Sequence, residues 1–378
     1  MRKTVFLIAG EESGDVLGGG LMAAMKEAQP EVRFIGVGGD AMTREGLSSL
    51  MPMQDLCVMG LFEVVMQMRR LLKLIDRMVE EIEKAQPDVV IGIDLPDFNF
   101  RVAKLLKKRG IYKGKILHYV APSVWAWRPG RAKYVAGFLD GLMCLFPFEP
   151  EYFTKHGLKA AYVGHSIIEQ DATPDRGMRK DLELGDDTLL IGLYLGSREQ
   201  EVKRHGAVFC EALNAIYEES PNTFVLVPTL PHLEYEVRKV LEECQMPFFV
   251  SSDAEKKWAA MKACDVAMAV SGTVGLELSY MNIPHLIAYR ANGLTAFVIK
   301  MLVKTKYAHL TNIILQKAAV PEFLQKECDD EIIAGEFSGL LESRDAQKED
   351  FAALRAALTQ SSDEAPSRRA AAFVAEFL

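Results

Sequence analysis

The chain has 378 residues, of which 49% are hydrophobic and 25% are charged, and its formal net charge is −8. This length is typical of two globular domains, and this composition supplies enough apolar side chains for two cores. The negative charge argues against a nucleic-acid partner, and no apolar run in the sequence is long enough to span a membrane as a helix.

The six cysteines are scattered without the close spacing of zinc ligands or redox motifs. Several lie in apolar runs, which favours reduced, buried cysteines in a cytoplasmic protein. The N-terminal residues pass directly into an apolar run and lack the cleavage region of a signal peptide. We therefore expect a cytoplasmic protein with no metal site and no cofactor.

Short apolar runs, each followed by a polar or glycine-rich turn, recur through the first half of the chain. They predict buried strands of a parallel sheet at residues 4–9, 33–37, 88–93, 115–120, 141–145 and 161–163. The first helix is expected to begin near Val16. It contains Gly18, Gly19 and Gly20, which permit the close approach of either a substrate or a packed helix.

Polar residues follow these strands at the sheet edge where open α/β folds bind ligands. The turn after the first strand contains Glu11 and Asp15 and suits hydroxyl recognition or acid–base chemistry better than phosphate binding. Asp94 follows residues 88–93 and is a candidate base, with a helix N-cap as the structural alternative. Residues 121–133 hold two of the three tryptophans beside three cations, which indicates a binding or domain-facing loop.

Residues 51–74 carry apolar side chains too densely for one face of a helix. Methionine and phenylalanine lie there beside Arg69, Arg70 and Lys73, a combination typical of a segment that contacts lipid. The alternative is a long core helix that begins here, and the residues alone favour this alternative slightly.

A polar, turn-rich stretch at residues 166–188 separates the two halves, and the strand–helix pattern restarts at Leu189. His165, just before this boundary, is expected to be structural. The second half predicts strands at residues 189–195, 223–227, 247–250, 266–270 and 284–289, and from residue 293 it is expected to be mainly helical.

The turn of Gly196, Ser197 and Arg198 joins a buried strand to a helix predicted from about Glu199. Free backbone N–H groups and a forked cation meet there, so the turn suits an anion such as phosphate. The structural alternative is an ordinary strand–helix turn with a solvated arginine.

A second turn of the same kind contains Ser271, Gly272 and Thr273. Glu277 lies about one and a half turns into the following helix, where a carboxylate can accept hydrogen bonds from sugar hydroxyls. The second half has neither the dinucleotide fingerprint nor the Walker lysine motif. Together the two turns favour a nucleotide-sugar donor, with the first half supplying the acceptor site and a base.

Seven motifs in this sequence resemble the lipid-A-disaccharide synthase family of GT-B glycosyltransferases, and they occur in order over nearly the whole chain. They are AGEESGD at 9–15, DLPDFN at 94–99, YVAPSVWAWR at 119–128, FPFE at 146–149, VGH at 163–165, GSR at 196–198 and SGTVGLE at 271–277.

The resemblance implies an α/β protein with two Rossmann-like, doubly wound domains at residues 1–168 and 169–345. It implies C-terminal helices at 346–378 that pack back on the first domain or on a partner chain, with a homodimer as one form. The implied reaction joins UDP-2,3-diacylglucosamine to 2,3-diacylglucosamine 1-phosphate with inversion. It forms the β-1,6 bond of lipopolysaccharide biosynthesis and releases UDP, in an enzyme peripherally associated with the inner membrane.

The residue patterns and the resemblance together give expected roles to individual residues. Asp94 is expected to be the general base, Arg198 to hold the leaving UDP, and Glu11 to be a further catalytic candidate. The expected UDP-binding residues are Gly196, Ser197, Arg198, Ser271, Gly272, Thr273, Glu277 and Asn312. The expected acceptor- and lipid-binding residues are Ser13, Asn99, Trp125, Met59, Phe62, Val65 and Arg69.

Two prolines of the family pattern are replaced in this chain, by Leu195 before GSR and by Thr311 before Asn312. Each replacement removes a fixed φ angle from a loop but leaves the phosphate-contacting groups in place. Two alternatives remain at this point. One is a UDP-GlcNAc 2-epimerase or another GT-B enzyme acting on a soluble sugar, and the other is a non-catalytic protein that binds a nucleotide sugar or a lipid.

Overall fold

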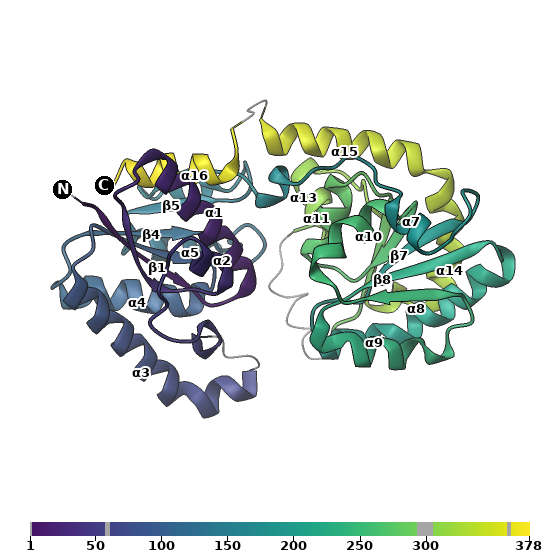
Figure 1. The fold of residues 1–378 in the computed structure, drawn as a ribbon, viewed down its shortest axis with the longest axis horizontal. Coiled ribbons are helices and arrows are strands. Elements are labelled where there is room, and N and C mark those ends of the chain that lie inside the picture. Colours follow the sequence, from purple (N-terminus) through teal and green to yellow (C-terminus); the bar gives the residue numbers. More distant parts are fainter. Residues whose placement is uncertain (1, 57–60, 293–304, 361–363) are drawn as a thin grey trace. The chain divides into compact units, whose positions relative to one another are not determined.

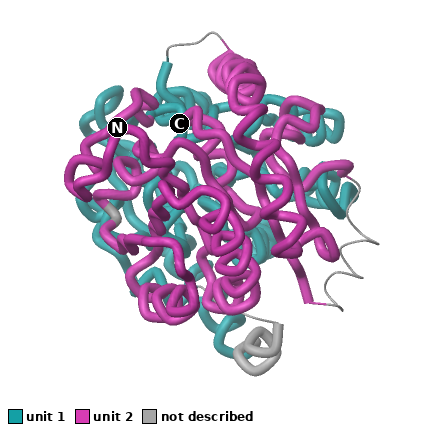
Figure 2. Tube along the Cα trace, turned by 90° about the vertical axis from the view of Figure 1, so that its right-hand side faces the viewer, with its two compact units in different colours: residues 1–169, 361–378 teal, residues 170–360 magenta. Residues whose placement is uncertain are grey.

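The computed structural model describes residues 2–56, 61–292, 305–360 and 364–378. The chain forms two compact units, unit 1 of residues 1–169 and 361–378 and unit 2 of residues 170–360 (Figure 2). Each unit contains a six-stranded parallel sheet with helices packed against it (Figure 1). The predicted fold of two Rossmann-like α/β domains is confirmed.

The sheet of unit 1 has the strand order β2-β1-β3-β4-β5-β6, and every pairing in it is parallel. Its central strand β3 is apolar and fully buried, as expected of a sheet covered on both faces. The strands are β1 (Thr4–Ala9), β2 (Arg33–Val37), β3 (Val89–Ile93), β4 (Lys115–Tyr119), β5 (Gly141–Cys144) and β6 (Lys159–Tyr162).

The helices of unit 1 follow its strands, and the last of them comes from the far end of the chain. Helix α16 packs on α1, so the C-terminal residues complete the layer begun by the N-terminal ones. The helices are α1 (Glu12–Ala28), α2 (Asp40–Arg44), α3 (Leu61–Ala85), α4 (Pro96–Arg109), α5 (Gly130–Ala136), α6 (Pro150–Thr154) and α16 (Pro366–Ala375).

The sheet of unit 2 has the order β12-β11-β10-β7-β8-β9 and is also parallel throughout. Five of its strands match the predicted ones, and β12 was not predicted because it has only three residues, with a glutamate among them. The strands are β7 (Leu189–Tyr194), β8 (Thr223–Pro228), β9 (Phe248–Ser251), β10 (Val266–Ala269), β11 (His285–Tyr289) and β12 (Glu322–Leu324).

The C-terminal helices divide between the two units at residue 360 rather than at residue 345. Helix α15 packs on α11 and α13 within unit 2, and only the chain beyond it joins unit 1. The helices of unit 2 are α7 (Gly177–Asp181), α8 (Glu199–Glu219), α9 (Glu234–Val240), α10 (Lys257–Ala263), α11 (Thr273–Tyr280), α13 (Leu310–Leu315), α14 (Asp330–Glu342) and α15 (Arg344–Thr359).

Each sheet has one point at which the strand order reverses. In unit 1 this point lies between β1 and β3, and in unit 2 it lies between β7 and β10. Connections leave such a pair of strands in opposite directions, so a crevice opens at the carboxyl ends of the two strands. The fold therefore selects the turns after β1, β3, β7 and β10 as the places to look for ligand-binding groups.

Within the described ranges, no helix is both long and apolar enough to cross a membrane. The five described cysteines are free thiols, and four of them are buried: Cys144, Cys210, Cys264 and Cys328.

We predict that α16 is an integral part of unit 1. Phe373 is 4% exposed against β5, so Phe373→Ala is expected to destabilise this unit by about 3–5 kcal/mol. Amide hydrogen exchange in β4–β6 should accelerate, while exchange in β7–β10 stays unchanged.

Arg368→Ala on the same helix is the matched control. Its ion pair with Glu27 joins two side chains that are each more than 60% exposed, so the change should have little effect. Equal exchange in the two variants would show that α16 contributes nothing to unit 1.

Candidate active site

Asp94 directly follows β3 and lies in a strained piece of backbone. Its φ angle is 51° and that of Leu95 is 44°, so two consecutive non-glycine residues adopt the left-handed conformation. Val120, which follows the neighbouring strand β4, has a φ of 82°, a value that is a clear outlier for a β-branched residue. Each such residue costs on the order of 1–3 kcal/mol, and strain of this kind clusters at functional sites.

Two polar side chains contact Asp94. The Ser13 hydroxyl donates to Asp94 Oδ2 at 3.1 Å, and the Asn99 side-chain amide donates to the Asp94 carbonyl at 2.8 Å. Asn99 is only 4% exposed, so it supports the turn from below and offers no surface for a direct contact with an acceptor. The structure thus brings Ser13, Asp94 and Asn99 together at the β1–β3 crevice.

Helix α1 begins at Glu12, earlier than the predicted start near Val16, with Glu11 as its N-cap residue. Glycine permits this early start, because a Cβ atom at Gly14 would lie 3.3 Å from the Ile93 carbonyl oxygen and 3.6 Å from Asp94 Cβ. The first turn of α1 therefore packs on the end of β3, and this packing places Ser13 next to Asp94.

Asp15 has a structural role that the sequence did not reveal. The residue is buried, and its carboxylate accepts hydrogen bonds from the backbone N–H groups of Gly39, Ala41 and Met42 at 2.7, 2.8 and 3.1 Å. It caps the start of α2 and is thus committed to holding α1 against α2.

The glycines of α1 serve helix packing. A Cβ atom at Gly18 would collide with Met42, and one at Gly19 would lie 3.2 Å from Ala41. Of the two readings open for these glycines, the structure supports close packing against α2.

Trp125 is half-buried, and its indole N–H donates to Glu149 Oε1 at 3.2 Å. The other oxygen of Glu149 accepts from the backbone N–H groups of Leu145 and Phe146, both at 3.0 Å. Burial raises the pKa of Glu149 to about 7, and this effect outweighs the hydrogen bonds, which lower the pKa. Glu149 lies in the FPFE motif but was not given a role from sequence, since only its burial in the fold reveals that it anchors Trp125.

His165 is structural, as expected. Its Nδ1 accepts from the backbone N–H of Ile167 at 3.1 Å, and its ring stacks on Phe146 with a centroid distance of 6.0 Å. Burial lowers the pKa of His165 to about 4, so the ring is neutral at physiological pH.

The turn after β7 has the predicted form, and a nearby carboxylate orders it. Gly196 has a φ of 103°, which favours glycine, and a Cβ atom there would collide with Glu201. Glu201 accepts from the Ser197 backbone N–H and from Arg198 Nη1, both at 3.1 Å. The Arg198 side chain stays 69% exposed, so its guanidinium is accessible to an anion.

The turn after β10 leads into α11, whose first residue is Thr273 and whose N-cap is Gly272. Gly272 and Thr273 are exposed and Ser271 is half-buried. Glu277 lies one turn further along and accepts from Lys257 Nζ at 2.8 Å, a partner that sequence reasoning missed. The predicted nucleotide groups therefore flank the strand-order reversal of unit 2, apart from Asn312.

Asn312 lies elsewhere in unit 2 and uses all its hydrogen-bonding groups within the protein. Its amide nitrogen donates to the Val320 carbonyl and to Glu322 Oε1, both at 2.8 Å, and its oxygen accepts from the N–H groups of Ala319 and Val320 at 2.8 Å. Asn312 closes this loop, and no polar group of its side chain is left for a nucleotide.

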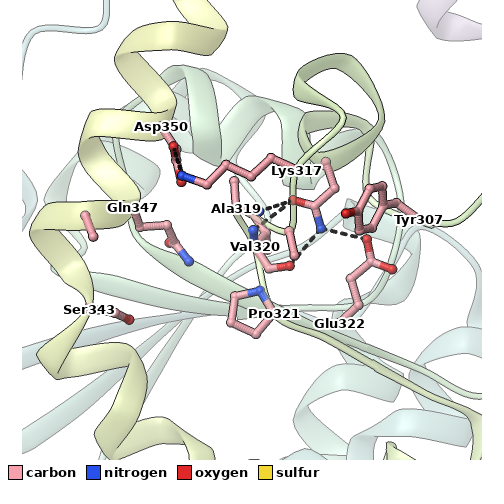
Figure 3. A pocket seen from close by; sticks show the side chains of 12 residues that line it. Tyr307, Lys317, Ala319, Val320, Pro321, Glu322, Ser343, Gln347 and Asp350 are labelled. Atoms are coloured by element: carbon pink, nitrogen blue, oxygen red, sulfur yellow. Dashed lines mark hydrogen bonds and ion pairs between the residues drawn. The ribbon is translucent and has the colours of Figure 1, made fainter.

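A cavity of about 480 Å³ adjoins this loop, at the amino end of β12 (Figure 3). Its lining includes Lys317, which is paired with Asp350 at 2.6 Å, and Gln347 from α15. Because it opens at the amino end of the sheet, this cavity is not part of the crevice formed by the turns after β7 and β10.

Two buried histidines support α11 from behind. His309 packs where a side chain at Gly275 would be, which explains that glycine in the SGTVGLE motif. His309 Nδ1 accepts from the Thr311 N–H at 3.1 Å, so its Nε2 is the donor to His285 Nε2 at 3.0 Å. Burial holds the pKa of His309 well below its usual range, and both rings are neutral.

Part of the expected lipid-binding segment is outside the described residues, and this includes Met59. Phe62 and Val65 lie in α3, but the structure does not describe their side chains. Arg69 on the same helix is exposed. Among the described residues, no group of histidine, cysteine, aspartate and glutamate side chains has the arrangement of a metal site.

Solved structures share this fold at low sequence identity. UDP-GlcNAc 2-epimerase from Neisseria meningitidis, bound to UDP-GlcNAc, aligns with a TM-score of 0.64 at 11% identity over 100% of this chain and 99% of that chain. The calicheamicin glycosyltransferase aligns with a TM-score of 0.63 at 13% identity over 100% and 98%. The fold and the strand-end turns thus define a two-domain protein of the GT-B class.

Sequence comparison gives the family. The pattern of the lipid-A-disaccharide synthetase family matches residues 5–377. Lipid-A-disaccharide synthase from Rhodospirillum centenum is 40% identical over 97% of this chain and 92% of that protein. The enzyme of that name from Pseudomonas syringae pv. tomato is also 40% identical, over 93% and 92%.

The chain belongs to the lipid-A-disaccharide synthase family and is a glycosyltransferase of lipid A biosynthesis. The resemblance seen in the seven motifs is confirmed, and the epimerase and binding-protein alternatives are not favoured.

We predict that burial of His165 makes the stability of unit 1 depend on pH. The folded pKa of about 4 lies below the unfolded value of about 6.5, so the contribution of His165 is fully present above pH 6.5 and is lost as the pH falls towards 4. Between pH 7.5 and 5 the wild type should lose about 2 kcal/mol more unfolding free energy than His165→Asn, which keeps an acceptor for Ile167.

Denaturant unfolding at the two pH values measures this difference. His156→Asn is the control, because His156 is exposed and should leave the pH dependence of the wild type intact. Identical pH dependence in His165→Asn and the wild type would contradict the assignment.

Proposed function

We propose that this chain transfers 2,3-diacylglucosamine from UDP to the 6-hydroxyl of 2,3-diacylglucosamine 1-phosphate. The observation that carries the proposal is the Asp94 carboxylate, held by Ser13 on a strained turn at the strand-order reversal of unit 1. A carboxylate fixed at that place is suited to removing a proton from a bound hydroxyl.

The proposed step is a direct displacement. Asp94 takes the proton of the acceptor 6-hydroxyl while that oxygen attacks the anomeric carbon of the donor sugar. The bond from this carbon to the UDP oxygen breaks, and UDP leaves with the electron pair. One displacement inverts the anomeric carbon and gives the β-1,6 disaccharide.

The turns of unit 2 are proposed to stabilise the leaving UDP. Arg198 has an exposed guanidinium ordered by Glu201, and it directly follows Gly196 and Ser197 in the turn after β7. Ser271, Gly272 and Thr273 add the N-terminus of α11, which favours a negative charge. Glu277 is the proposed acceptor for ribose hydroxyls, and Lys257 balances its charge.

The remaining residues of unit 1 are proposed to define the acceptor side. Glu11 ends the turn after β1 and precedes Ser13, so we assign it to an acceptor hydroxyl. Trp125 is fixed by Glu149 and supplies an apolar wall with a polar edge. Asn99 acts on the site by holding the backbone of Asp94.

We also propose that the protein works in the cytoplasm, attached peripherally to the inner-membrane surface. Both substrates carry acyl chains, and the sequence around Met59, Phe62 and Val65 is apolar next to Arg69 and two further cations. A homodimer stays a prediction, since α16 packs on α1 of its own chain in this structure.

The proposed role of Asp94 as the base can be tested by substitution. Asp94→Asn keeps the shape and the acceptor oxygen for Ser13 but cannot accept the proton, so kcat should fall by about 10²–10⁴-fold. The dissociation constant for UDP should not change, because the proposed nucleotide contacts all come from unit 2. Steady-state kinetics and calorimetric UDP titration measure the two quantities.

Asp97→Asn is the control for this variant. Asp97 lies three residues further along, and its side chain is 89% exposed, so its ion pair with Arg131 should contribute little. Its kcat should equal that of the wild type. Full activity in Asp94→Asn would remove Asp94 from the mechanism.

The proposed membrane contact of the segment around Phe62 and Val65 can also be tested by substitution. The double variant Phe62→Gln and Val65→Gln should bind vesicles of zwitterionic and anionic phospholipid at least about tenfold more weakly, because burial of one such side chain is worth about 1.5–3 kcal/mol. Vesicle sedimentation measures the binding. Ile111→Gln, which changes an exposed apolar residue elsewhere in unit 1, is the control.

Unchanged vesicle binding and activity in the double variant would show that this segment belongs to the protein core.

A further inference from the structure

Two buried polar side chains converge over Gly92, which lies in β3 two residues before Asp94. Gly92 lies on β3 directly beside His118 on β4. A Cβ atom at Gly92 would lie 2.8 Å from Asn99 Cβ and 3.0 Å from His118 Nδ1, so both side chains occupy the space that glycine leaves open. A cavity of about 10 Å³ lies there, lined by these three residues and by apolar side chains.

The orientation of the Asn99 amide is fixed by three carbonyl groups. Its nitrogen donates to the Asp94 carbonyl at 2.8 Å and lies 3.4 Å from the carbonyls of Ile8 and Ile93. Rotation of the amide would turn its oxygen towards three acceptors, which is repulsive. Asn99 Oδ1 therefore faces away from the carbonyls, and it has no hydrogen-bond partner among the described residues.

His118 presents a second acceptor. The residue is 1% exposed, and burial lowers the pKa of its ring to about 3, so the ring is neutral. Its Nε2 is buried and has no hydrogen-bond partner within the described part of the chain. In the tautomer protonated on Nδ1, Nε2 presents a lone pair to the cavity.

Two acceptors cannot satisfy each other, but a water molecule offers two donors. A buried acceptor without a partner costs about 1–3 kcal/mol, which favours occupation of the cavity. About 10–15 Å³ of such volume holds one water molecule, so this cavity matches one.

We propose that a single ordered water molecule donates to Asn99 Oδ1 and to His118 Nε2, and that His118 is thereby a positioning residue for Asp94. The chain of contacts runs from His118 through the water to Asn99, and from Asn99 Nδ2 to the Asp94 carbonyl. It fixes the amide that holds the left-handed Asp94–Leu95 turn in place. The role of His118 rests on the proposed function, because it acts through the proposed base.

The kinetic test compares two substitutions of His118. His118→Leu removes the acceptor, and kcat should fall between about 10- and 100-fold, since a shift of about 1 Å in a catalytic group costs on that order. The UDP dissociation constant should be unchanged. His118→Gln keeps a side-chain acceptor and should recover most of the lost kcat, whereas His156→Gln, at an exposed histidine, should match the wild type.

A purely structural role for His118 would lower the unfolding free energy of both substitutions and leave the kcat of the folded enzyme unchanged, which would overturn the proposal. A high-resolution crystal structure of the wild type tests the water directly and does not depend on how the variants fold. One density peak within hydrogen-bond distance of Asn99 Oδ1 and His118 Nε2 is expected. Absence of that peak at full local order would also overturn the proposal.

The proposed function fails in a different way, through a wild type that does not turn over the two lipid substrates. The density peak of the water in the crystal structure can be observed whatever the outcome of that activity assay.

Discussion

The reversal of strand order in each sheet is the constraint on which the site depends. At β1 and β3, and again at β7 and β10, neighbouring parallel strands send their connections in opposite directions, so a crevice opens beyond their carboxyl ends. The groups of the proposed mechanism follow these four strands directly: Glu11 and Asp94 in unit 1, and Arg198 and Thr273 in unit 2. The chemistry therefore comes from short turns, while the sheets hold those turns in position.

The two units hold their turns by different means. In unit 1, Asp94 is fixed by left-handed backbone, whose cost is offset by hydrogen bonds from Ser13 and Asn99 and by the close packing of α1 at Gly14. In unit 2, the Arg198 turn is held by a carboxylate of the helix that follows. A base needs a fixed direction for proton transfer, whereas a diphosphate site needs an accessible cation with some freedom to adjust.

Most of the fold could be predicted from sequence, because buried parallel strands are runs of apolar residues bounded by turns. The features that could not be predicted depend either on the packing of one turn or on contacts between distant segments of the chain. The start of α1 was placed too late because Ser13, Gly14 and Asp15 are typical turn residues, and only their packing on β3 makes them helical. The family resemblance pointed to Asn99 and Asn312, but their burial depends on contacts with distant segments that no local pattern encodes. The same holds for Glu149.

The central claim is an acceptor-dependent glycosyl transfer, and UDP release tests it most directly. The purified protein would be supplied with UDP-2,3-diacylglucosamine and 2,3-diacylglucosamine 1-phosphate in detergent, with and without EDTA. The account predicts UDP release that requires the acceptor and persists in EDTA. No release from a protein that still binds UDP would contradict it and leave a nucleotide-binding GT-B protein with another acceptor.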